Sequence, residues 1–230
     1  MPAAAVPRGG KSLVNVSGLY TGGAAVLEAS GQRSGIVKSP QARVQVMREG
    51  LAGDVQVDRR YHGGPEQAVH QFALRSYAAL LAAFPALATR AVAGSIGENL
   101  SCAELDEDSV CVGDVHAIGE VELQVSQPRR PCTKIDARYG VDGIARWLAA
   151  RRMPGWYYRV LKPGTIALGD PVTLIARPNP EVPLARLLAA SGEACPSLAE
   201  LERLLACAGL GADWRRRLQE RLAFQRERSP

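Results

Sequence analysis

The composition of the chain changes at Arg177-Pro178-Asn179-Pro180, and this change limits the folds that are available to it. Before that point, short valine-rich runs are separated by glycine turns, a pattern typical of strands. The runs that predict strands are 13–19, 44–47, 55–58, 110–118, 121–125 and 171–175. Beyond that point the pattern is helical. We therefore predict two domains, residues 12–177 and residues 178–230, with a stiff proline-containing linker where they meet.

The first domain also contains two helical patterns. Residues 66–84 carry apolar side chains close to a 3.6-residue period, and Pro65 suits the first turn of a helix. Residues 143–152 form a second predicted helix. Short strands with helices inserted in their connections predict a mostly β fold, namely a closed or nearly closed barrel.

The second domain is predicted to be all α. One short helix is expected over residues 184–190. Ser197 begins the next helix, over residues 198–208, and Glu200 follows three residues later as in a capping box. A third helix is expected over residues 213–224. The whole chain is thus predicted to be a β-barrel followed by a small three-helix domain.

The net charge is +5, and its distribution bears on the partners of the chain. Nucleic-acid-binding proteins usually interleave basic residues with aromatic ones, and aromatic residues make up only 5% here. We therefore expect a small anionic ligand or an acidic partner rather than nucleic acid. Much of the charge lies near the C-terminus, where we expect arginines that aid solubility, with a surface for an acidic partner as the alternative. These residues are Arg215, Arg216, Arg217, Arg221, Arg226 and Arg228.

The cysteines and histidines exclude several common classes of protein. The five cysteines are odd in number and contain no CxxC pair, so neither a disulfide framework nor a zinc ribbon is expected. The three histidines do not have the spacing of a zinc protease. No apolar run of about 18 residues predicts a membrane span, and the N-terminus lacks the apolar core of a signal peptide. The cytoplasm is the expected compartment.

The segment Gln127 to Lys134 contains the strongest candidate for chemistry. Cys132 follows a strand-like run, and two prolines stiffen the loop that carries it. Arg129, Arg130 and Lys134 place three cations within three residues of the sulfur. Nearby positive charge favours the thiolate, and the same cations suit an anionic ligand such as a phosphate. An ordinary buried cysteine in a basic surface loop is the alternative.

Three further segments carry weaker signals. In Gly53 to Gly64, an alternating pattern predicts that Asp54, Gln56 and Asp58 share one strand face, which runs into cations and His62. The alternative is a polar strand face with a tight turn. Asn99, in a glycine-rich loop, can donate and accept hydrogen bonds at once, which suits the edge of a heterocycle; a plain turn is the alternative. Lys38, in Lys-Ser-Pro, is either an anion ligand or a solvated lysine.

Taken together, these segments resemble the MOSC-domain proteins, a family named after the C-terminal domain of molybdenum-cofactor sulfurase. The motifs occur in the same order as in that family and span nearly the whole chain from about residue 13. The C-terminal helices resemble the 3-alpha domain of the subgroup that includes the bacterial 6-hydroxylaminopurine-resistance protein. The motifs are Lys38-Ser39-Pro40, Gly53-Asp54 to Gly64, Gly97-Glu98-Asn99-Leu100, Gly113-Asp114, Pro128-Arg129-Arg130-Pro131-Cys132 and Gly169-Asp170.

The resemblance implies a MOSC-type β-barrel that binds molybdenum cofactor, with Cys132 as the protein ligand of molybdenum. A soft thiolate suits a molybdenum centre that the pterin dithiolene already holds through sulfur. The other residues expected to bind the cofactor are Lys38, Asp54, Arg59, Asn99, Arg129, Arg130 and Lys134.

The resemblance further implies a molybdenum-dependent reductase that removes the hydroxyl group from N-hydroxylated compounds, such as hydroxylaminopurines, other hydroxylated bases and amidoximes. Cys132 is then the catalytic cysteine, and His62 and Asp58 are candidate proton donors. The chain has no iron–sulfur cysteine pattern and no dinucleotide fingerprint, so we expect electrons from a separate reductase.

Three alternatives stay open at this stage. The chain can be a carrier of cofactor or sulfur without catalysis of its own. It can also be a metal-free cysteine-nucleophile enzyme, for which His62 offers a base, or a pyridoxal-phosphate-type enzyme. A nucleic-acid module is the weakest alternative. The C-terminal helices suit either a homodimer surface or a dock for the reductase.

Overall fold

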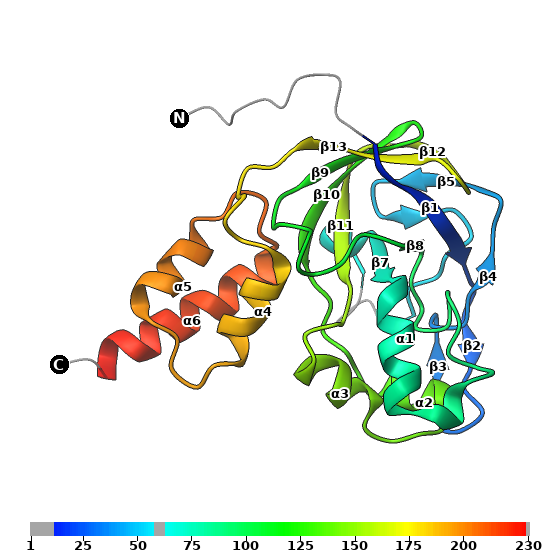
Figure 1. The fold of residues 1–230 in the computed structure, drawn as a ribbon, viewed down its shortest axis with the longest axis horizontal. Coiled ribbons are helices and arrows are strands. Elements are labelled where there is room, and N and C mark those ends of the chain that lie inside the picture. Colours follow the sequence, from blue (N-terminus) through cyan, green and yellow to red (C-terminus); the bar gives the residue numbers. More distant parts are fainter. Residues whose placement is uncertain (1–11, 58–62, 229–230) are drawn as a thin grey trace.

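Strand β1 (Ser12–Thr21) closes a barrel, because it pairs with β8 (Leu100–Cys102) and also with β13 (Pro171–Ala176). The structure is a computed structural model that describes residues 12–57 and 63–228. Within that part of the chain, seven strands form the ring β13–β9–β10–β11–β7–β8–β1 (Figure 1). The bounds of the others are β7 Val69–Ala73, β9 Val115–Ile118, β10 Val121–Pro128 and β11 Trp156–Lys162. The predicted mostly β barrel is confirmed.

Short strands extend the barrel at its margins. β4 (Ser39–Pro40) pairs with β1 outside the ring. β12 (Gly164–Ala167), β5 (Arg43–Met47) and β6 (Gly50–Leu51) form a three-stranded sheet. β2 and β3 form a small hairpin, with bounds Ala25–Val26 and Arg33–Ser34. Every ring pair is antiparallel except β7 with β8, which is parallel.

Helices fill the connections of the barrel, as predicted for a barrel with insertions. α1, α2 and α3 lie close together below the strands in the view of Figure 1. They share a hydrophobic cluster that includes Phe72, Leu80, Ile135 and Leu148. The bounds are α1 Leu74–Ala83, α2 Lys134–Tyr139 and α3 Ile144–Ala150, with short 3-10 helices η1 Pro65–Gln67 and η2 Pro85–Leu87.

The C-terminal region forms three helices beside the barrel, which agrees with the predicted helical domain (Figure 1). They are α4 Leu184–Gly192, α5 Leu198–Leu205 and α6 Ala212–Arg228. Leu187, Leu201 and Trp214 belong to one continuous buried cluster with Leu123 and Val125 of the barrel. The helical domain is therefore packed on the barrel through a shared core. In the described residues, no helix is both long enough and apolar enough to cross a membrane.

The predicted helix over residues 66–84 is wrong in its first half. Residues Val69–Ala73 form strand β7 and are all buried, and the helix begins only at Leu74. β7 pairs with β11 on one side and β8 on the other. Both neighbours are distant in sequence, and this pairing outweighs a helical period that the local sequence also fits.

Two predicted strands also need correction. Residues 55–57 form no strand, so the predicted shared strand face of Asp54 and Gln56 is wrong; Asp58 lies outside the described residues. The strand predicted over 110–118 begins only at Val115, because the carboxylate of Asp114 accepts a hydrogen bond from the Cys111 amide and closes a turn. The sequence patterns also did not predict α2, β8, β11 or β12.

Candidate functional site

A single pocket gathers most of the residues that the sequence singled out. Its lining includes Lys38, Asp54, Asn99, Arg129, Cys132 and Lys134. Arg130 is exposed and is not among the lining residues. Asp58, Arg59 and His62 lie outside the described residues, although Val57 and Gly63 on either side of that gap line the pocket. Chain folding thus brings together side chains that are up to about a hundred residues apart.

Cys132 lies between the end of a strand and the start of a helix. β10 ends at Pro128, and the carbonyl of Cys132 accepts a hydrogen bond from the Ile135 amide at 3.0 Å, in the first turn leading into α2. The thiol is free and half-buried. The loop therefore presents a sulfur atom that a ligand in the pocket can reach.

Arg129 is a buried cation that faces the pocket without a carboxylate partner among the described residues. It is 6% exposed, and its Nη1 donates to the Ile96 carbonyl at 2.9 Å. Its Nε is buried and has no hydrogen-bond partner in the described chain. A buried charge without a counter-ion is costly, and a guanidinium binds carboxylates and phosphates well. The side chain is suited to an anionic ligand.

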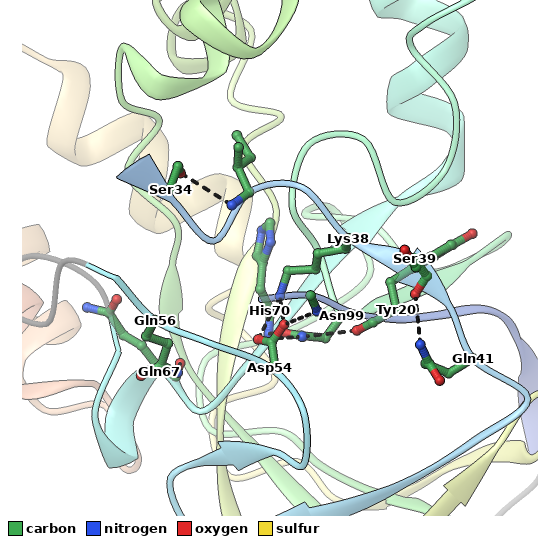
Figure 2. A network of polar contacts seen from close by, with 12 residues as sticks. Tyr20, Ser34, Lys38, Ser39, Gln41, Asp54, Gln56, Gln67, His70 and Asn99 are labelled. Carbon is green, nitrogen blue, oxygen red and sulfur yellow. Dashed lines mark hydrogen bonds and ion pairs between the residues drawn. The ribbon is translucent and has the colours of Figure 1, made fainter. Parts of the chain in front are cut away.

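Lys38, by contrast, is neutralised within the protein (Figure 2). Its Nζ lies 2.7 Å from both carboxylate oxygens of Asp54, and each side chain is 6% exposed. Burial lowers the pKa of Lys38, while the charge of Asp54 opposes that shift. Asp54 also accepts a hydrogen bond from the amide of Gly22 at 2.9 Å. The pair therefore forms a rigid wall of the pocket, and Lys38 is not a free cation there.

Asn99 holds this wall together rather than presenting its amide freely to a ligand. Its Nδ2 donates to Asp54 Oδ2 at 3.0 Å and to the Tyr20 carbonyl at 3.2 Å (Figure 2). Its Oδ1 accepts from the His70 amide at 3.0 Å. These bonds use both amide protons of the side chain. The edge that the sequence assigned to a heterocycle is thus mostly occupied by the protein.

His70 and Tyr157 also line the pocket, and the sequence patterns assigned neither of them a catalytic or cofactor-binding role. They pair across β7 and β11, and their rings lie 5.1 Å apart between centroids. Burial, together with the charge of Arg129, lowers the pKa of His70 well below its usual range, so the ring is neutral. Burial raises the pKa of Tyr157, so its hydroxyl keeps its proton. Their pairing was missed because the sequence predicted a helix where β7 forms.

A buried carboxylate supports the loop that meets Arg129. Glu98 Oε1 accepts hydrogen bonds from the Tyr77 hydroxyl at 2.7 Å, the Gly94 amide at 2.6 Å and the Ser101 hydroxyl at 3.1 Å. Burial raises the pKa of Glu98. These bonds fix the turn that carries the Ile96 carbonyl, the acceptor for Arg129. Glu98 therefore acts on the pocket indirectly.

A barrel with this cysteine loop and a helical C-terminal domain agrees with two family models. The model of the MOSC domain matches residues 58–173. The model described as a YiiM-like, 3-alpha helix domain matches residues 196–225. The chain belongs to the MOSC domain family, and the resemblance inferred from the motifs is confirmed.

Individual relatives cover most of the chain. Protein YiiM of Escherichia coli is 34% identical over 186 residues, which is 78% of this chain and 83% of that protein. Its crystal structure superposes with a TM-score of 0.75 over 92% of this chain and 94% of that chain. Protein YflK of Bacillus subtilis is 32% identical over 87% of this chain and 91% of that protein. A Gibberella moniliformis protein named Reductase is 37% identical over 52% of this chain and 22% of its own length.

Proposed function

We propose that the chain is a MOSC-type oxidoreductase that binds molybdenum cofactor in this pocket and reduces N-hydroxylated compounds, such as hydroxylaminopurines and amidoximes. The observation that carries the proposal is that one pocket holds both a half-buried free thiol, Cys132, and a buried cation, Arg129, that has no carboxylate partner among the described residues. The name of the Gibberella relative supports the reductase class.

The residues of the pocket fit such a cofactor. A thiolate is a soft ligand that suits a sulfur-bound molybdenum centre. Arg129 and Lys134 line the same pocket and carry the charge that a cofactor phosphate requires. Within residues 12–57 and 63–228, no group of three His, Cys, Asp or Glu side chains is arranged to hold a metal ion. The described residues thus offer a metal at Cys132 no complete ligand set, which suits a cofactor whose dithiolene supplies further ligands.

When bound, the cofactor supplies the two-electron reduction of the N–O bond. The protein then has to orient the substrate and deliver protons. Tyr157 keeps its hydroxyl proton and lines the pocket, so it can donate a hydrogen bond to the departing oxygen. Neutral His70 packs against Tyr157 and fixes its ring. His62 and Asp58 remain predicted proton donors, and a separate reductase remains the proposed electron source.

Metal content tests the proposal directly. Wild-type protein, Cys132→Ala and Cys195→Ala are produced in a molybdate-fed host, and molybdenum per chain is measured. Cys195 is an exposed cysteine of the helical domain and serves as the matched control. We expect close to one molybdenum per chain in the wild type and in Cys195→Ala, and a loss of metal in Cys132→Ala.

Activity of the loaded protein separates the reductase from the carrier. With a chemical electron donor, the wild type should convert hydroxylaminopurine to the amine. Metal that is retained without such conversion, and that passes to an apo-enzyme on mixing, would instead establish the carrier function. A wild type that contains no molybdenum, from a host shown to load other molybdenum enzymes, would overturn both.

A further inference from the structure

The N-terminal end of α6 holds the strand that leads into the cysteine loop. The indole Nε1 of Trp214 donates a hydrogen bond to the Pro128 carbonyl at 3.1 Å, and Trp214 is 5% exposed. One turn earlier, the Gly211 amide donates to the Ser126 carbonyl at 2.8 Å. Pro128 is the last residue of β10 and precedes Cys132 by four residues. The helical domain therefore fixes the point from which the cysteine loop departs.

The same helix end also holds a second segment of the pocket. The Ala212 amide, at the start of α6, donates to Glu66 Oε2 at 3.1 Å. A carboxylate at this position is favoured because the N-terminus of a helix carries partial positive charge and unpaired amides. Arg159 Nη2 donates a hydrogen bond to the same oxygen of Glu66 at 2.8 Å. Glu66 directly precedes Gln67, a lining residue of the pocket.

The end of β10 is also covered. Ser126 is 0% exposed and Gln127 is 3% exposed, although both lie at the end of their strand. A Cβ atom at Gly211 would come within 2.2 Å of Gln127 Oε1, so the approach of the helical domain to this strand is close. The next residue, Arg129, is bonded to the barrel side: its amide donates a hydrogen bond to the Gly155 carbonyl at 2.9 Å. The loop is thus held from two sides, by the barrel and by α6.

We propose that the helical domain is part of the scaffold of the site, and that Trp214 is a positioning residue for Cys132. In this interpretation, the hydrogen bond from Trp214 to Pro128 keeps the cysteine loop closed against the pocket. The inference rests on the proposed function only for the importance of Cys132. It concerns the loop itself, so it is tested on metal-free protein without substrate.

The test compares thiol reactivity in full-length, metal-free variants. Trp214→Phe keeps an aromatic ring in the core and removes the donor. The alkylation rates of Cys132 and Cys195 by iodoacetamide are measured separately by peptide mass spectrometry, with exposed Cys195 as the internal reference. We expect the Cys132 rate to rise by up to about five-fold, since loss of one neutral buried hydrogen bond changes an opening equilibrium by about that factor and the half-buried thiol already reacts in the closed loop. The Cys195 rate should stay the same.

Two further variants distinguish positioning from general destabilisation. Glu66→Gln weakens the second contact of α6 and should also raise the Cys132 rate. Leu204→Val weakens the core of the helical domain, where Leu204 is 0% exposed, and should leave the Cys132 rate unchanged. The inference is overturned if Trp214→Phe leaves the Cys132 rate unchanged or lowers it, or if Leu204→Val raises it as much as Trp214→Phe does.

Discussion

Arg129 and Lys38 line the same pocket, but the described residues give a carboxylate partner only to Lys38. A buried ion pair contributes little net stability, yet removal of one partner leaves the other charge buried and unpaired. Neutralisation of Lys38 should therefore lower the stability of the fold, whereas neutralisation of Arg129 should change it little. We expect Lys38 to stabilise the fold, and the proposed function assigns Arg129 to ligand binding, at some cost to the stability of the empty protein.

The first prediction concerns Arg129→Met. Arg129 has no carboxylate partner among the described residues, so its removal should leave the free energy of unfolding within about 1 kcal/mol of the wild type, because the desolvation cost that is relieved offsets the lost hydrogen bond to Ile96. Molybdenum content should nevertheless fall several-fold, since the anionic ligand loses its guanidinium. Urea unfolding and metal analysis measure the two effects. A variant that unfolds easily but keeps its metal would contradict this assignment.

The second prediction concerns Lys38→Met, which, like Arg129→Met, replaces a long cationic side chain by an uncharged one. It leaves Asp54 buried without its cation, so we expect a loss of about 3–5 kcal/mol in the free energy of unfolding. The additional variant Asp54→Asn with Lys38→Met should recover part of that loss. Urea unfolding of the wild type, the single variant and the double variant checks this. Equal stability of these three proteins would show that the ion pair does not stabilise the fold.

The third prediction concerns pH and Glu107. Its Oε1 accepts from the Gly155 amide at 2.7 Å, and its Oε2 is buried without a partner in the described chain. Burial raises the pKa of Glu107 from 4.5 to about 7. Between these values the folded state binds more protons than the unfolded state, so stability falls as pH rises. The stabilising contribution is complete below pH 4.5 and is lost as pH rises through about 7.

The difference in pKa corresponds to roughly 3 kcal/mol at most. Glu107→Gln mimics the neutral acid, so it should be about as stable as the wild type at pH 4.5 and more stable at pH 8. Glu104→Gln, at an exposed position, serves as the control and should follow the wild type at both values. Urea midpoints measured between pH 4.5 and pH 8 check the predicted direction of the stability change. A difference in midpoint between wild type and Glu107→Gln that does not vary with pH would refute it.

At the scale of single elements, the helical domain offers a clear test. The Ser197 hydroxyl accepts a hydrogen bond from the Glu200 amide at 3.1 Å and caps α5, as the capping-box pattern predicts. The reciprocal contact differs, because the Glu200 carboxylate pairs with Arg186 instead. Ser197→Ala should therefore destabilise the protein by about 1 kcal/mol. Thermal unfolding measures the loss, and Ser197→Asp should restore stability.

Elements that depend on interactions between neighbouring residues were predicted well from the sequence, and elements that depend on distant pairing were not. α4, α5 and α6 follow local periodicity and capping, and their predicted positions agree within a few residues. β7 does not, because its conformation depends on pairing with Trp156–Tyr158 far along the chain. α2 follows a proline-stiffened loop and has only six residues, so its local signal is weak. Short elements that distant contacts stabilise are the ones that the sequence missed.

The same distinction applies to the pocket. Cys132, Arg129 and Lys134 were found because their residue types are unusual within one short segment. His70 and Tyr157 join them only through the pairing of β7 with β11, which no local pattern reports. The partner of Lys38 was also not predicted, since Asp54 was placed on the face of a strand that does not form.

At the scale of the whole molecule, barrel and helical domain share one buried cluster. The C-terminal arginines are also used within the helical domain: Arg216 and Arg217 pair with Asp213, Arg226 pairs with Glu202, and Arg221 donates to the carbonyls of Ala190 and Ser191. These contacts give the charges a structural role beyond the solubility expected of them.

The shared core predicts that the two domains unfold together. Far-ultraviolet circular dichroism and tryptophan fluorescence should give coincident transitions in urea, since Trp214 reports on the contact between the domains and Trp156 on the barrel. Two separated transitions would show that the helices unfold independently and would weaken the proposed role of α6 as a scaffold.

The closure of the barrel by β1 and β13 also bears on how the protein is made. Ser12 of β1 pairs with Thr173 of β13, so β1 cannot complete its pairing during synthesis until β13 has left the ribosome. Such distant pairing makes folding slow, and the unpaired edge of β1 is meanwhile exposed to other chains. A nascent chain of this protein is therefore expected to need protection by chaperones, and a ligand can enter the finished pocket only after translation of the barrel is complete.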